Sequence, residues 1–234
     1  MTWNVGHRGA AGLEPENTLR SFLRASEEGA DALELDLRVT RDGHLVVLHD
    51  RTVDRRTNGT GPVFEMTLKQ LQQLDAGLGE RVPTLYEVVE ATVLPIYAEL
   101  KVIEAARALA ELHKDDSIAG RVTPISFRPE ILGEVRAVLP DFSLGLVLSG
   151  APPDADERAR AVGAALVSLE ASHLQPGVVE RCRRAGLRTT TWTVNDPEEM
   201  KWALDLGLDG VVTDRPDLLT RLTKRERRRS SWQE

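Results

Sequence analysis

Short apolar segments alternate with longer amphipathic segments along most of this chain, and this alternation constrains the fold more than any other feature. We expect the apolar segments to form strands at residues 3–6, 33–37, 45–49, 95–100, 122–126, 144–148, 165–169, 189–194 and 210–213. We expect helices from residue 17 or 18 to 28 and at 103–112, 129–139, 154–162, 177–185 and 197–206. Strands that alternate with helices favour an α/β fold with a parallel sheet, in its simplest form a (β/α)₈ barrel.

Three segments depart from the alternation. The strand candidates outnumber the eight places in such a barrel, and the link between residues 36 and 45 carries the hairpin signal Asp42-Gly43, so the chain is expected to double back there. A turn-rich stretch begins at Asp50, and we expect an insertion over about residues 50–92 that covers the functional site. The single barrel domain is then expected to span residues 1–222, followed by a charged, disordered tail at 223–234.

Two carboxylates stand one residue apart inside an apolar segment, at Glu34 and Asp36. Alternate side chains of a strand share a face, so both carboxylates should point the same way. Burial raises the free-energy cost of keeping neighbouring carboxylates ionised, and a bound divalent cation such as Mg²⁺ or Ca²⁺ would offset it.

Polar residues gather where the expected strands end, which is the face that carries catalytic residues in a barrel. They are His7-Arg8-Gly9, Glu34 with Asp36, His49-Asp50, Glu99-Leu100-Lys101 and Trp192-Thr193-Val194-Asn195. Each signature alone is compatible with a structural role, such as a cap, an ion pair or a core aromatic. Together they predict one site at one end of the barrel.

The inventory of these side chains favours phosphodiester cleavage. His7 and His49 can serve as general acid and general base near neutral pH. A carboxylate-bound cation can polarise a phosphoryl oxygen, while Arg8 and Lys101 balance the charge that develops in the transition state. The chain has neither a Walker A motif nor a G-x-S-x-G motif, which argues against nucleotide-driven phosphoryl transfer and against a serine hydrolase.

Composition and the N-terminal sequence restrict the expected binding partners and the cellular location of the protein. The net charge of −7 disfavours nonspecific binding to nucleic acid or to an anionic membrane. A single cysteine, Cys182, excludes an internal disulfide framework. The first twelve residues lack the apolar segment of a secretory signal, and no apolar run approaches the roughly 20 residues of a membrane span, so we expect a cytoplasmic protein without membrane insertion.

The chain resembles the glycerophosphodiester phosphodiesterases from about residue 3 to 220. The matching motifs occur in order: His7-Arg8-Gly9, Pro15-Glu16-Asn17-Thr18, Glu34-Leu35-Asp36, Thr40-Arg41-Asp42-Gly43, Val46-Val47-Leu48-His49-Asp50, Asp54-Arg55-Arg56-Thr57-Asn58-Gly59, Pro83-Thr84-Leu85, Glu99-Leu100-Lys101, Ser126-Phe127, Trp192-Thr193-Val194-Asn195 and Asp209-Gly210-Val211-Val212-Thr213-Asp214-Arg215-Pro216.

This resemblance implies a TIM barrel with an insertion after the third strand, and hydrolysis of a small glycerophosphodiester to sn-glycerol 3-phosphate and an alcohol such as choline or ethanolamine. It implies that His7 and His49 form the acid–base pair, with Arg8 and Lys101 near the phosphate and Trp192 on the glycerol or leaving-group side. It further implies one divalent cation, held by Glu34, Asp36 and Glu99; oxygen ligands suit Mg²⁺ or Ca²⁺, with Mn²⁺ as a third choice. Direct attack by water and a cyclic phosphate intermediate both remain open, as does the oligomeric state.

Two alternatives use a similar barrel. A phospholipase of the phosphoinositide C or sphingomyelinase D type would need an apolar rim for its lipid, and the aromatic content of only 4% argues against one. A noncatalytic phosphodiester-binding barrel would not need the pair His7 and His49. Both alternatives therefore rank below the hydrolase.

Overall fold

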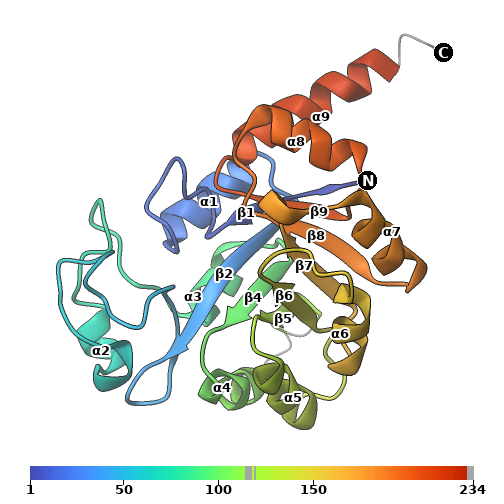
Figure 1. Ribbon diagram of the computed structural model, residues 1–234. Coiled ribbons are helices and arrows are strands. Elements are labelled where there is room, and N and C mark those ends of the chain that lie inside the picture. Colours follow the sequence, from blue (N-terminus) through green and yellow to red (C-terminus); the bar gives the residue numbers. More distant parts are fainter. Residues whose placement is uncertain (114–117, 119, 231–234) are drawn as a thin grey trace.

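The computed structural model describes residues 1–113, 118 and 120–230, with the backbone alone at 225–230. Within these residues eight parallel strands follow the order β1-β9-β8-β7-β6-β5-β4-β2, and pairing of β1 with β2 closes them into the expected barrel (Figure 1). The strands are β1 (Trp3–His7), β2 (Ala32–Val39), β3 (Leu45–Val47), β4 (Ile96–Leu100), β5 (Val122–Ser126), β6 (Gly145–Leu148), β7 (Leu166–Glu170), β8 (Arg188–Trp192) and β9 (Gly210–Thr213).

The surplus strand is β3, which pairs antiparallel with the end of β2. The turn between them contains Gly43 at φ 85°, a conformation that glycine adopts without strain. The expected reversal after Asp36 is therefore confirmed, and β3 lies outside the barrel ring.

Most helices lie between consecutive barrel strands and pack on the outside of the sheet (Figure 1). They are α1 (Leu19–Glu27), α2 (Leu68–Leu71), α3 (Leu85–Ala91), α4 (Glu104–Leu112), α5 (Pro129–Val138), α6 (Ala155–Ala161), α7 (Pro176–Arg184), α8 (Pro197–Asp205) and α9 (Pro216–Ser230), with 3₁₀ helices η1 (Val63–Glu65) and η2 (Ala171–His173). Thr18 caps α1 as its sequence suggested, and its side chain accepts a hydrogen bond from Ser21 N.

Apolar side chains separate into layers inside and outside the barrel. Outward-facing strand residues such as Leu33, Leu35 and Leu37 pack against the helices in the largest cluster. Their neighbours on β2, Glu34 and Asp36, take the opposite face, as a period of two requires. The barrel interior is filled by a smaller cluster: Val5, Ala32, Tyr97, Ile125, Val147, Leu166 and Val212.

The segment after β3 has its own small core around Val53, Leu71 and Val82. It includes η1 and α2 and lies beside the end of β2, as expected for an insertion next to the site (Figure 1). Its far boundary differs from the expected residue 92. Helix α3 packs Leu85 and Val88 into the main core, so residues 85–91 act as a helix of the barrel layer.

The C-terminal segment also differs in part from expectation. Residues 223–230, expected to be disordered, continue helix α9, and residues 231–234 lie outside the described part. None of the helices in the described residues combines the length and the apolarity that crossing a bilayer requires.

Candidate active site

Strand register brings together carboxylates that are far apart in the sequence. In the parallel pairing of β2 with β4, Asp36 lies opposite Glu99, and in that of β1 with β2, His7 lies opposite Glu34. Glu34, Asp36 and Glu99 are buried, and each offers an oxygen within 4.8 Å of the others. All three acids therefore meet at the carboxyl end of the barrel, where the sequence placed them.

The three carboxylates differ in their electrostatic surroundings. Burial and the nearby Asp36 raise the pKa of Glu34 to about 7. Burial also raises the pKa of Glu99, although Lys101 opposes the shift. Burial acts in the same direction on Asp36, but Lys101 and Arg8 outweigh it and hold its pKa below the ordinary value. Burial thus makes ionisation of Glu34 and Glu99 costly, whereas Asp36 is held in its ionised form.

Two cations and one amide fix the position of Asp36. Arg8 Nε lies 3.1 Å from Asp36 Oδ2, and Lys101 Nζ lies 3.0 Å from Oδ1. Asn17, at φ 58°, donates from Nδ2 to Asp36 Oδ2 at 2.8 Å. Lys101 Nζ also lies 2.7 Å from Glu99 Oε1, so one ammonium bridges two of the acids.

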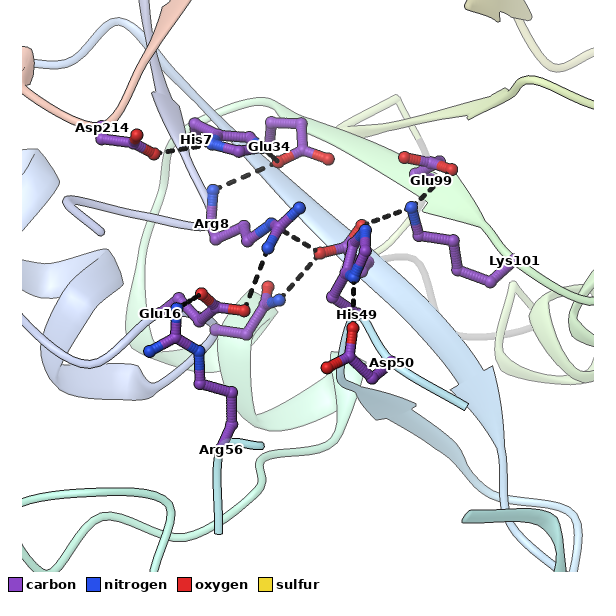
Figure 2. Close-up of polar contacts among 12 residues, drawn as sticks. His7, Arg8, Glu16, Glu34, His49, Asp50, Arg56, Glu99, Lys101 and Asp214 are labelled. Atoms are coloured by element: carbon purple, nitrogen blue, oxygen red, sulfur yellow. Dashed lines mark hydrogen bonds and ion pairs between the residues drawn. The ribbon is translucent and has the colours of Figure 1, made fainter. Parts of the chain in front are cut away.

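Each of the two expected catalytic histidines contacts a carboxylate through Nδ1 (Figure 2). His7 Nδ1 lies 2.7 Å from Asp214 Oδ1, and His49 Nδ1 lies 2.6 Å from Asp50 Oδ1. A carboxylate only accepts, so these contacts place a proton on Nδ1 and leave Nε2 to exchange one.

The two imidazoles differ in pKa. Burial acts to lower the pKa of His7, but Asp214 and Glu34 outweigh it and the pKa lies above its usual value. Burial lowers the pKa of His49, with Lys101 adding to the shift against Asp36 and Asp50. The pKa values of the two histidines are therefore shifted in opposite directions.

A cavity of about 260 Å³ opens between these groups and runs into the barrel. His7, Arg8, Glu34, His49, Glu99, Lys101 and Trp192 line it, so seven of the eight residues singled out from the sequence face one space, and Asp36 lies directly behind Arg8 and Lys101. Trp192 ends β8 and packs edge-on against Phe127 with ring centroids 5.2 Å apart. The floor is apolar, with Val147, Leu166 and Val212.

Sequence reasoning assigned no role to several residues that shape this site. Asp214 belongs to the quoted motif after β9, yet only closure of the barrel brings it to His7. Asp50, considered as a loop cap, contacts the His49 ring. Glu16 binds Arg8, Arg55 and Arg56 and so joins the insertion to the loop after β1. The motifs contained these residues, but their spacing gave no signal of the contacts.

Comparisons with known proteins agree with this geometry. The family model described as "Glycerophosphoryl diester phosphodiesterase family" matches residues 7–218. A glycerophosphodiester phosphodiesterase of Caldanaerobacter subterraneus subsp. tengcongensis is 36% identical over 94% of this chain and 97% of its own length. A Bacillus subtilis glycerophosphodiester phosphodiesterase is 32% identical over 94% of this chain and 86% of its own.

Solved structures give the same result. The Oleispira antarctica phosphodiesterase, in complex with the product sn-glycerol-3-phosphate, superposes with a TM-score of 0.87 at 27% identity, covering 94% of this chain and 96% of that one. The glycerophosphodiester phosphodiesterase of Thermotoga maritima superposes with a TM-score of 0.82 at 29% identity, covering 95% and 99%. The fold of this chain is thus shared with known phosphodiesterases.

Proposed function

Because this chain belongs to the glycerophosphoryl diester phosphodiesterase family and is a phosphodiesterase of that kind, we propose that it hydrolyses glycerophosphodiesters to sn-glycerol 3-phosphate and an alcohol with the side chains gathered in its barrel cavity. The observation that carries this proposal is the convergence of His7, His49 and the three acids on one cavity. The product found with the Oleispira antarctica enzyme supports the choice of substrate.

His7 and His49 move the protons of the reaction. Each keeps Nδ1 against its carboxylate and presents Nε2 as the atom that takes or gives a proton. One ring accepts the proton of the attacking hydroxyl, and the other protonates the departing alkoxide. A positioned pair of this kind contributes about 10²- to 10⁴-fold to the rate for each proton transfer.

Arg8 and Lys101 bind the phosphate. Both are held by buried carboxylates, so their positive ends are fixed at the cavity before a substrate arrives. The guanidinium fork of Arg8 suits two phosphate oxygens, and the Lys101 ammonium acts as a point charge. Trp192 forms the apolar wall on the glycerol or leaving-group side.

The acids fit a divalent cation. Their oxygens are hard ligands within 4.8 Å of one another. Burial raises the pKa values of Glu34 and Glu99, and a bound cation would offset the cost of ionising them. Glu34, Asp36 and Glu99 would hold the ion. When bound, it supplies positive charge that polarises a phosphoryl oxygen and favours an ionised attacking hydroxyl. Mg²⁺ and Ca²⁺ both suit oxygen ligands, and Mn²⁺ is the third candidate.

The test is release of sn-glycerol 3-phosphate from glycerophosphocholine and glycerophosphoethanolamine, after chelation and with Mg²⁺, Ca²⁺ or Mn²⁺ added back. We expect no release without a cation. His7→Ala and His49→Ala should abolish turnover while diester binding persists, whereas His44→Ala, in the exposed turn after β2, should leave the rate unchanged. Full activity after exhaustive chelation would remove the metal from the proposal, and turnover in both variants would remove the histidines.

We further propose that residues 1–222 form a single catalytic barrel domain, since the family model covers 7–218. The same proposal includes a cytoplasmic location, a place in glycerol and lipid metabolism, and the absence of a nucleic-acid partner. They are supported by the free, buried thiol of Cys182 and by the net charge of −7.

A further inference from the structure

A second groove, of about 320 Å³, lies at the same end of the barrel as the catalytic cavity. It runs between the insertion, which contributes Phe64, and the segment after β4, which contributes Val102 and the first residue of α4, Glu104. Val102 directly follows Lys101, and Arg51 stands two residues after His49. The groove therefore adjoins the catalytic residues along two segments of the chain.

Arg38 connects the groove with the site. It stands on the same face of β2 as Glu34 and Asp36, one step further toward the strand end. Its Nε and Nη2 donate to the carbonyl oxygen of His49 at 2.9 and 2.6 Å. The guanidinium thus forms the border between His49 on one side and the groove on the other.

The groove has an excess of positive charge. Among the described residues that line it, Arg38 and Arg51 stand against one carboxylate, that of Glu104. An anion placed between the two guanidiniums would relieve their repulsion.

Arg51 differs from the other arginines around the site. Arg8, Arg55 and Arg56 all contact Glu16, and Arg55 also contacts Asp50. Among the residues that the structure describes, the exposed side chain of Arg51 has neither an ion pair nor a hydrogen bond. The ion pairs of Glu16 and Asp50 do not include Arg51, so its guanidinium is available to bind a ligand.

We propose that Arg38 and Arg51 form a second anion subsite, which binds a phosphate group carried by the alcohol half of the diester. The inference rests on the proposed function, because the scissile phosphate must occupy the neighbouring cavity. The inference predicts that the enzyme prefers glycerophosphodiesters whose alcohol carries a further phosphate to those whose alcohol is neutral or cationic.

The test compares two diesters that differ in one group: glycerophosphoglycerol, and the same molecule with a phosphomonoester on its terminal glycerol. With the divalent cation present, we expect the wild-type enzyme to show about tenfold higher kcat/KM on the phosphorylated diester. Arg51→Glu should reduce this preference to less than about twofold and leave kcat/KM on glycerophosphoglycerol within about twofold of wild type.

Arg188→Glu is the matched control. It makes the same change in net charge at another exposed arginine, at the start of β8 and so at the opposite end of the barrel. If the preference reflects only the overall field of the protein, both substitutions will reduce it equally, and the subsite is overturned. A wild-type enzyme with no preference overturns it as well.

A binding measurement separates this inference from the proposed function. In the His7→Ala background, calorimetry should give a dissociation constant about tenfold lower for the phosphorylated diester, and adding Arg51→Glu should remove the difference. Equal dissociation constants would refute the subsite whether or not the wild-type enzyme turns over. Failure of the wild-type enzyme to cleave either diester would instead count against the proposed function.

Discussion

The ammonium of Lys101 lies 3.0 Å from an oxygen of Asp36, inside the carboxylate cluster that we propose as the metal site. It also lies 2.7 Å from Glu99, and these carboxylates raise the pKa of Lys101 against the effect of burial. A lysine and a divalent cation would therefore share the same two acids. We therefore expect the lysine to favour phosphate binding and to weaken cation binding, because like charges repel.

We predict opposite effects of Lys101→Met on the two ligands. The variant should bind Mg²⁺ about three- to tenfold more tightly, because one competing charge is gone. At saturating Mg²⁺ its kcat/KM should fall about 10²-fold, because the phosphate loses a fixed positive charge. Calorimetric Mg²⁺ titration and steady-state kinetics measure the two effects. Lys201→Met, on the exposed face of α8, serves as the control, and weaker Mg²⁺ binding by the Lys101 variant would contradict the prediction.

Glu16 is predicted to stabilise the insertion against the barrel. Its buried carboxylate contacts Arg8 at 3.0 Å, Arg55 at 2.8 Å and Arg56 at 2.5 Å, which together hold its pKa below the usual range against the effect of burial. Glu16→Gln should lower the free energy of unfolding by about 2 to 3 kcal/mol, because three guanidiniums lose a shared charged acceptor.

The control for Glu16 is Glu180→Gln on α7, whose carboxylate also pairs with two arginines but is 43% exposed. Exposed pairs contribute little to stability, so this change should have a much smaller effect on the free energy of unfolding than Glu16→Gln. Urea unfolding of both variants measures the difference. Equal effects of the two substitutions would show that the Glu16 contacts are no stronger than surface ion pairs.

The site was predictable from sequence where a local rule was sufficient. A period of two placed Glu34 and Asp36 on one face, and the rule for barrel strands placed His7 and Glu99 at one end. His49 follows β3, which is antiparallel and outside the ring, so it reaches the site through the chain reversal after β2 and not through that rule. The pairing of Asp36 with Glu99 then follows from the neighbouring positions of β2 and β4 in the barrel. Apart from His49, these residues needed no information beyond strand polarity.

Other features depended on contacts that no local pattern encodes. Asp214 reaches His7 only because β9 pairs with β1 and closes the ring. The partners of Glu16 come from the insertion, whose path over the site depends on its own small core. For the same reason α3 was grouped with the insertion, although its apolar face packs in the main core.

Asp214 is predicted to position His7 for proton transfer. Its other oxygen accepts a hydrogen bond from Asn195 Nδ2 at 2.6 Å, so the carboxylate is held from both sides. Asp214→Asn should lower kcat by about 10²-fold or more with little change in KM, because the amide no longer specifies the tautomer with Nε2 free. A kcat near that of wild type would exclude this role, and an increase in KM alone would point to substrate binding instead.

Asp217 gives a pH-dependent contribution to stability away from the active site. It is 4% exposed, and Arg215 donates to both of its oxygens at 2.9 and 3.0 Å, which, with Arg221, lowers its pKa below the ordinary value of 3.8. A carboxyl whose folded pKa is depressed stabilises the fold above its unfolded pKa and loses that contribution as pH falls through the folded value. At pH 7 Asp217→Asn should therefore reduce the free energy of unfolding by about 1.5 to 3 kcal/mol, the range for hydrogen bonds to a charged group. The difference from wild type should shrink as the pH drops below about 4, the ordinary pKa of an aspartate.

Urea unfolding at several pH values measures this difference. The exposed helix pair of Asp154 and Arg158 serves as a control, because its removal should have the smaller effect. A difference that stays constant down to pH 3 would mean that Asp217 acts through packing and not through its charge.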